Sequence, residues 1–113
     1  NYTAHGISGN GSSASAYGYT GTDEFFNYTA GAGAGSNVFG AGVTDILDYT
    51  NTNKYKTVRI LGGTDDNSGS ASQSRLTFSS SLWMSTSAIT SISFNPSGQT
   101  FAQYSTLALY GVK

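Results

Sequence analysis

Apolar and polar side chains alternate with a period of two in several short runs of this chain. The run 106–110, for example, places Leu107 and Leu109 on one side and Ala108 on the other. Successive side chains of a β-strand point to opposite faces, so each run predicts a half-buried strand. Helical patterns are nearly absent, and the one segment where a helical turn competes, residues 43–48, is flanked by glycines and by Thr-Asn repeats that favour an extended chain.

The alternating runs recur at the spacing of an all-β domain. We expect about eight strands, at residues 2–7, 14–19, 25–29, 38–49, 56–61, 75–79, 90–94 and 106–110. Clusters of Gly, Asn, Ser and Asp separate them, at residues 9–13, 31–37, 62–69 and 95–98. This pattern predicts a single antiparallel β-sandwich, jelly-roll-like, spanning residues 1–113 as one domain.

The sharpest turn signal is the sequence Asn-Pro-Ser-Gly at residues 95–98. Pro96 presets φ for a turn and Gly98 can take a positive φ, so we expect a hairpin flanked by Phe94 and Phe101. The Gly-Ala run at 31–35 is better explained as a loop within one domain than as a linker between two.

Composition restricts the classes of partner. Charged residues make up 10% of the chain, against about 25% in ordinary globular proteins, and the net charge is −1. No basic stripe favours nucleic acid, and no apolar run approaches the roughly 20 residues of a membrane span. The chain has no cysteine, which excludes disulfides and thiolate metal sites. Aromatic residues, at 13%, argue against disorder. We therefore expect no binding of nucleic acid and no membrane insertion.

A catalytic site would have to use His5, the sole histidine, together with a serine and a carboxylate. The available aspartates are Asp23, Asp45, Asp48, Asp65 and Asp66. The chain has no Gly-x-Ser-x-Gly elbow, and the acidic pairs Asp23-Glu24 and Asp65-Asp66 are sequence neighbours, whose side chains point to opposite faces of a strand. A structural role for His5 is the better interpretation, and we expect no catalytic site and no cofactor.

Two further patterns suggest binding sites. Asp65, Asn67 and Gly69 match the start of a calcium loop, but Leu76 stands where the loop requires a glutamate, so an Asx-rich turn is expected and no metal site. Trp83 could stack on a sugar ring, although a single Trp is better explained as a core or interface anchor.

The cationic cluster of Lys54, Lys56 and Arg59 lies near Asp45 and Asp48 in the sequence. This arrangement predicts cross-strand or intersubunit ion pairs in preference to a phosphate site. Glycosylation sequons also occur, at Asn1, Asn10 and Asn27, at a frequency expected in a chain so rich in Ser and Thr.

Several segments together resemble the structural proteins of tailed-bacteriophage virions. They are residues 48–59, residues 85–94, the opening 1–13 and the final run 105–113, which ends Leu-Tyr-Gly-Val-Lys. Chains of that family commonly close on an aromatic strand of the Leu-Tyr-Gly-Ile/Val type. The resemblance implies a non-enzymatic β-sandwich on the surface of a virus particle. The alternation of Leu107 and Leu109 with Ala108 and Tyr110 separately predicts that the last strand lies inside a sheet.

The function expected from this resemblance is structural. We expect a symmetric, trimeric module of a tail fibre or appendage that contacts the host surface, with other virion proteins and host glycans as its further partners. A capsid decoration protein is the main alternative, and a free carbohydrate-binding or hydrolytic domain is a third. The fold class alone does not separate these functions.

Overall fold

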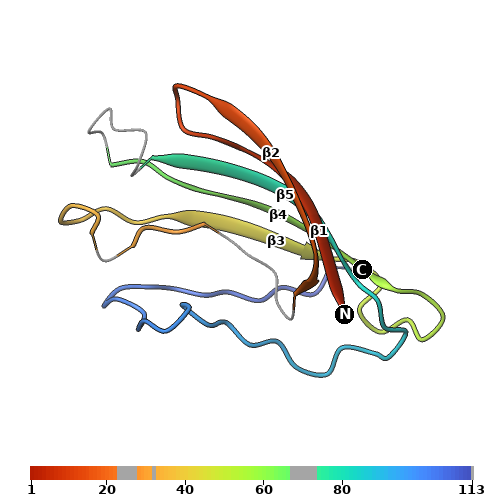
Figure 1. Cartoon of the computed structure of the whole chain (residues 1–113). Helices are drawn as coiled ribbons and strands as arrows, with labels where there is room; N and C mark the ends of the chain where they lie inside the picture. The colour runs from red at the N-terminus through yellow and green to blue at the C-terminus, as the bar shows by residue number, and fades with distance from the viewer. Residues whose placement is uncertain (23–27, 32, 67–73, 113) are drawn as a thin grey trace.

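A computed structural model describes residues 1–22, 28–31, 33–66 and 74–112, and the described residues form five strands and no helix. The strands are β1 (Tyr2–Gly9), β2 (Ala14–Thr22), β3 (Ala41–Ile46), β4 (Lys56–Thr64) and β5 (Arg75–Trp83). They form one sheet in the order β2-β1-β5-β4-β3, and each neighbouring pair is antiparallel (Figure 1). The all-β class and the antiparallel pairing are thus confirmed.

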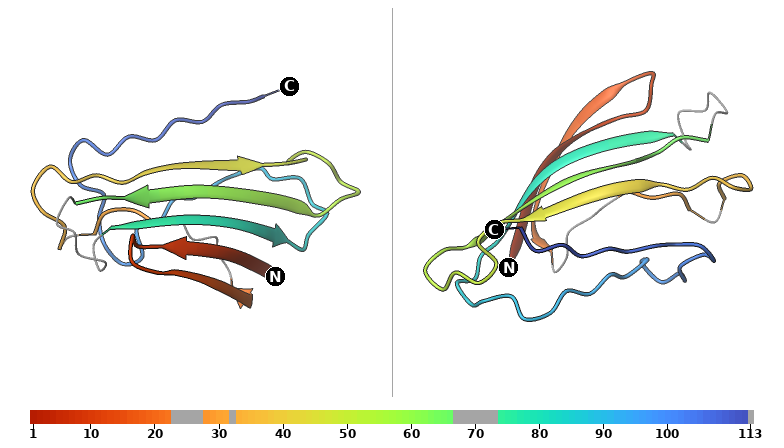
Figure 2. Two further views of the ribbon diagram at one scale, coloured as in Figure 1. Left: turned by 90° about the horizontal axis from the view of Figure 1, so that it is seen from above. Right: turned by 180° about the vertical axis from the view of Figure 1, so that it is seen from behind.

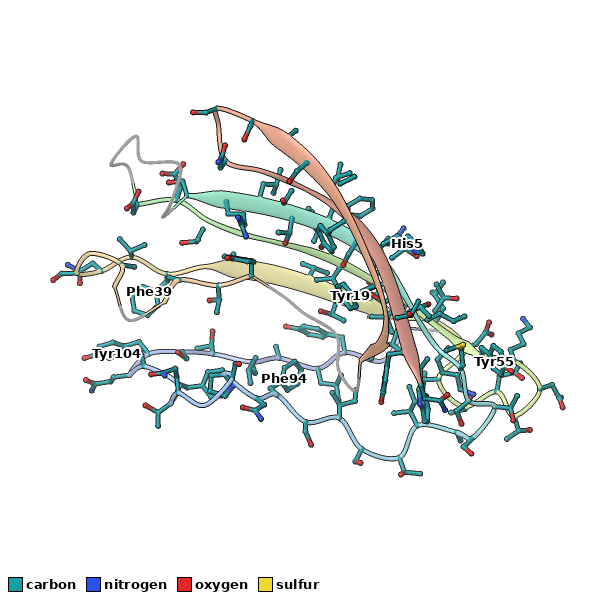
Figure 3. The ribbon with its side chains drawn as sticks, in the orientation of Figure 1. His5, Tyr19, Phe39, Tyr55, Phe94 and Tyr104 are labelled. Carbon is teal, nitrogen blue, oxygen red and sulfur yellow. The ribbon has the colours of Figure 1, made fainter. Side chains whose placement is uncertain are left out.

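The period of two predicted from the sequence decides which side chains share a face. Val58 and Ile60 of β4 are buried on the inner face of the sheet. Opposite them on β5 lie Ser81 and Ser79, and Ala4 of β1 completes this small core. Arg59 and its alternate neighbours on β4 point to the outer face instead. Figure 3 shows the same division at the other end of the sheet, with His5 outside and Tyr19 on the inner side.

Residues 84–112 correct two of the strand predictions. This segment runs out and back beneath the inner face of the sheet (Figures 1 and 2), yet neither 90–94 nor 106–110 joins a ladder. Leu107 and Leu109, expected inside a sheet, are 62% and 81% exposed. Alternation of apolar and polar side chains makes a segment suitable for pairing. A strand also needs a neighbouring segment whose backbone groups can form hydrogen bonds with it. Of the predicted strand 25–29, residues 25–27 lie outside the described part.

The predicted turn at residues 95–98 is confirmed, one position later than expected. The Gln99 amide donates to the Pro96 carbonyl oxygen over 3.1 Å, and Ser97 and Gly98 between them have φ values of 48° and 79°. Two positive φ values in succession are the pattern of a type I′ turn, the turn that suits a β-hairpin. The segments beside it nevertheless form no ladder, so the hairpin expected around Phe94 and Phe101 is incomplete.

The sheet and its C-terminal segment leave much surface uncovered. The accessible area is 8258 Å², whereas the usual relation for a folded monomer of 11.7 kDa gives roughly 5,900 Å². The radius of gyration is 15.2 Å, against about 13 Å for a compact chain of this length. One five-stranded sheet is present among the described residues, and the eight-stranded jelly-roll sandwich stays a hypothesis.

Candidate assembly surface

An unbroken apolar row crosses the outer face of the sheet. Val43 of β3 lies opposite Leu61 of β4, Leu61 lies opposite Phe78 of β5, and Phe78 lies opposite Ile7 of β1. These four side chains are each between 46% and 62% exposed. Directly opposed residues of neighbouring strands have side chains in contact distance, so the row forms one continuous ridge over four strands.

A shallow apolar hollow adjoins one end of this outer row. It has a volume of about 320 Å³ and lies between β3, β4 and β5. Its lining consists of Ala41, Gly42, Val43, Leu61, Gly62, Gly63 and Leu76. The glycines and Ala41 fill little space beside Leu76, which is itself 59% exposed. The hollow therefore offers room for an apolar side chain from outside the subunit.

A polar row borders the outer row on its other side. Asp45, Arg59, Ser80 and His5 follow one another across β3, β4, β5 and β1. The Arg59 guanidinium donates to Asp45 Oδ2 from Nη2 over 2.7 Å and from Nε over 3.1 Å. The outer face thus joins an apolar band to a charged border, the arrangement typical of protein interfaces with a dry centre and a polar rim.

The C-terminal segment presents a second apolar surface. Besides the two leucines, Tyr104, Tyr110 and Val112 are each at least 80% exposed. Within the described part of the chain, residues 106–112 make no backbone hydrogen bond. An exposed, extended and apolar segment with free amide and carbonyl groups is a template for pairing with another chain.

Lys56 is the feature that the sequence did not reveal. Its side chain is fully buried, and Nζ donates to the carbonyl oxygens of Asn51 (2.6 Å), Lys54 (2.9 Å), Thr86 (3.0 Å) and Ser85 (3.4 Å). The ammonium also lies 6.0 Å from the centre of the Trp83 ring. One cation therefore ties the β3–β4 loop to the start of the C-terminal segment.

The alternation of faces along β4 could have predicted that this lysine is buried, because Lys56 lies on the same inner face as Val58 and Ile60. The predicted ion pairs are confirmed for the other two cations, since Lys54 pairs with Asp48 at 3.3 Å and Arg59 pairs with Asp45. The prediction that Lys56 belongs to the same cationic cluster was wrong, because its ammonium is buried and donates to backbone carbonyl oxygens.

The structure separates the residues of the hypothetical catalytic triad. His5 lies opposite Gly18 and Ser80, and three strand spacings, about 14 Å, separate it from Asp45. Asp48 pairs with Lys54. The Ser74 hydroxyl oxygen lies 3.3 Å from Asp65 Oδ1 and 3.1 Å from Asp66 Oδ1, so its one proton is shared between the two carboxylates. Asp23 and residues 67–69 of the calcium-like run fall outside the described ranges.

The remaining sequence candidates lie in structural positions. Trp83 is half-buried on the inner face and stacks on Tyr2 with ring centres 6.4 Å apart, which agrees with an anchor. Asn10 Oδ1 accepts hydrogen bonds from the amides of Ser12 and Ser13 and so closes the β1–β2 turn. Asn1 Nδ2 donates to the Met84 carbonyl oxygen over 3.1 Å, and Asn27 is not among the described residues. None of the clusters found in the described ranges gathers three residues of metal-binding type.

Comparison of the chain with known protein families, with curated proteins and with solved structures gave no match. The part of the chain that the structure describes has no helix long and apolar enough to cross a membrane. The two exposed apolar surfaces are accordingly the candidate site, and their chemistry suits protein–protein contact.

Proposed function

We propose that this chain is a non-enzymatic structural protein that works as one subunit of a symmetric assembly on the surface of a phage particle. The observation that carries the proposal is the exposed apolar surface. Only Ala4, Val58 and Ile60 form the buried apolar core among the described residues, whereas the outer row and the C-terminal segment lie open to solvent. A subunit with so small a core gains stability by covering its apolar faces with other copies.

The excess surface is large enough for at least two contacts per subunit. The accessible area exceeds that of a compact monomer by roughly 2,400 Å², and a stable interface buries about 800 Å² on each partner. The outer row and the C-terminal segment are different surfaces, as a head-to-tail ring requires, whereas a two-fold dimer would use one surface twice. A homotrimer is the smallest ring with this geometry.

The resemblance of the sequence to phage virion proteins supports the location on a particle. Within that class we favour a module of a tail fibre or appendage that meets the host surface, because the exposed aromatic side chains include Tyr28, Phe39, Tyr49, Tyr55 and Tyr104. Aromatic rings are suited to half-wet contacts with glycans and proteins. In the eight-stranded sandwich expected from the sequence, the second sheet would include residues 90–94 and 106–110.

Capsid decoration is the second candidate, and the outer apolar row favours it. A decoration protein needs an apolar base that docks on capsid subunits, and the row from Val43 to Ile7 has that character. A free carbohydrate-binding module is the third. The polar hollow of about 140 Å³ beside Arg75 and the β1–β2 turn would be its site.

The assembly is tested by light scattering and native mass spectrometry on the purified chain at micromolar concentration. A trimer is expected, and a monomer alone would overturn the proposal. Binding to whole host cells and to undecorated capsids, measured in parallel, separates the fibre module from the decoration protein. Binding to neither, with affinity for isolated polysaccharides, would favour the free carbohydrate-binding module.

A further inference from the structure

We propose that residues 105–112 of one subunit pair as an added strand along the β3 edge of a second copy of the chain. The inference rests on the proposed assembly and names the segments that build it. The donor is the unpaired C-terminal segment, and the acceptor is the outer edge of Ala41–Ile46.

The donor is prepared for pairing in its sequence and in its conformation. Residues 105–110 alternate like a strand, and the type I′ turn at 96–99 is the kind that joins strands of a hairpin. The turn that leads into the segment is closed by the Ser105 amide, which donates to the Ala102 carbonyl oxygen over 3.1 Å. Tyr104 within it has a φ of 73°, a strained value for a bulky residue.

The acceptor edge lacks the features that usually block pairing. β3 contains no Lys, no Pro and no bulge, and its only charged residue, Asp45, is held by Arg59. Residues 41–46 form backbone hydrogen bonds with β4 and with no other segment in the described ranges. The opposite edge of the sheet, β2, carries a register shift near Thr20–Thr22 and a Gly21 with φ of 77°. Such irregularity protects an edge, so β3 is the edge open to an added strand.

We place the C-terminal segment of a second copy at the β3 edge, because the segment of the same chain lies beside β3 without pairing with it. Residues 105–112 follow β3 in the same direction in all three ribbon views (Figures 1 and 2), and in the described part of the chain residues 106–112 make no backbone hydrogen bond. Pairing within the chain would add a parallel strand to a sheet whose pairs are all antiparallel. A segment arriving from another subunit can run in the opposite direction and extend the antiparallel ladder.

One antiparallel register matches the side chains on both faces. With Leu107 opposite Val43, Leu109 falls opposite Ala41 and Ser105 opposite Asp45. Leu107 then lengthens the outer row to a fifth strand, and Leu109 enters the apolar hollow of about 320 Å³ beside Ala41. Ser105 can donate its hydroxyl to the Asp45 carboxylate. On the other face, the small residue Ala108 meets Gly42.

Disulfide trapping tests the pairing, because the chain has no cysteine of its own. Val43→Cys and Leu107→Cys are made as separate variants, unfolded together, refolded as a mixture and oxidised. In the proposed register the two Cα atoms lie roughly 4.5–5.5 Å apart, within the range that a disulfide spans. A covalent dimer of one Val43→Cys chain with one Leu107→Cys chain is expected. The matched control replaces Leu107→Cys with Ala108→Cys, whose Cβ points to the other face.

Each outcome decides the inference. A heterodimer with Leu107→Cys and little with Ala108→Cys supports it. Equal trapping by both variants, or none by either in protein that light scattering finds assembled, overturns the strand pairing and leaves the assembly standing. A bridge that forms within one chain when Val43→Cys and Leu107→Cys are combined, and not between chains, also overturns it. If the chain is a monomer throughout, the pairing and the proposed assembly both fail.

Discussion

Replacement of the buried ammonium in Lys56→Met is expected to destabilise the fold by about 3 kcal/mol. The ammonium has three protons, so it satisfies the carbonyl oxygens at 2.6, 2.9 and 3.0 Å and makes a weaker shared contact with the fourth at 3.4 Å. Each hydrogen bond to a charged group is worth about 1.5–3 kcal/mol. The desolvation of the ammonium, which costs several kcal/mol, offsets part of this sum.

Methionine keeps most of the length of the lysine side chain, so the change removes the charge and its donors and leaves little cavity. Three carbonyl oxygens then lose their donor in a buried site, and the β3–β4 loop loses its bond to residues 85–86. Chemical denaturation at a fixed protein concentration measures the difference, since assembly makes stability depend on concentration. In a thermal melt the midpoint should fall by roughly 10–20 °C.

Lys54→Met is the matched control. Lys54 lies two residues earlier, and its ammonium pairs with Asp48 at the surface over 3.3 Å. An exposed pair of this kind contributes about 0.5 kcal/mol or less. If Lys56→Met cost no more than Lys54→Met, the four carbonyl contacts would not hold the loops together, and the reasoning would be refuted.

Further substitutions probe the sheet and its outer face. Gly6→Ala should cost about 1–3 kcal/mol in chemical denaturation, because the added Cβ would lie 2.5 Å from the Tyr17 ring and 2.8 Å from a β5 carbonyl oxygen. Leu61→Asp should dissociate the assembly in light scattering while the circular dichroism of the sheet stays unchanged; an intact trimer would contradict the role of the outer row. Arg59→Ala should change the free energy of unfolding by less than about 1 kcal/mol, since its ion pair is exposed. Polysaccharides and synthetic glycosides should remain uncleaved by the protein and by His5→Ala alike. Cleavage by the unmodified protein that is lost in His5→Ala would instead identify a histidine-dependent hydrolase.

Local patterns in the sequence account for what could be predicted of the fold. The predicted strand positions, taken from alternation and spacing, include all five observed strands to within a few residues, and Gly98 marked the turn at 96–99 because a positive φ is cheapest in glycine. These features depend on residues close together in the chain. The ion pairs of Arg59 and Lys54 were also within reach, since their carboxylate partners lie on the neighbouring strand and in the adjacent loop.

The candidate site could be predicted only in part, because its exposure depends on what covers each face. The strand pattern of 106–110 is as regular as that of 75–79, yet only the second finds a partner in the sheet. The apolar side chains of Val43, Leu61 and Phe78 lie exposed on the outer face, and no local pattern shows which face of the sheet stays uncovered.

The sequence by itself determined the all-β class, the turn positions and the side chains that share a face, because each follows from the strand period and from the φ preferences of single residues. The tertiary structure decided the order β2-β1-β5-β4-β3, the burial of Lys56 under two loops and the unpaired state of residues 106–112. These outcomes depend on contacts between residues distant in the chain. A local sequence pattern favours the conformation that such contacts require, but it does not determine which segment becomes the partner.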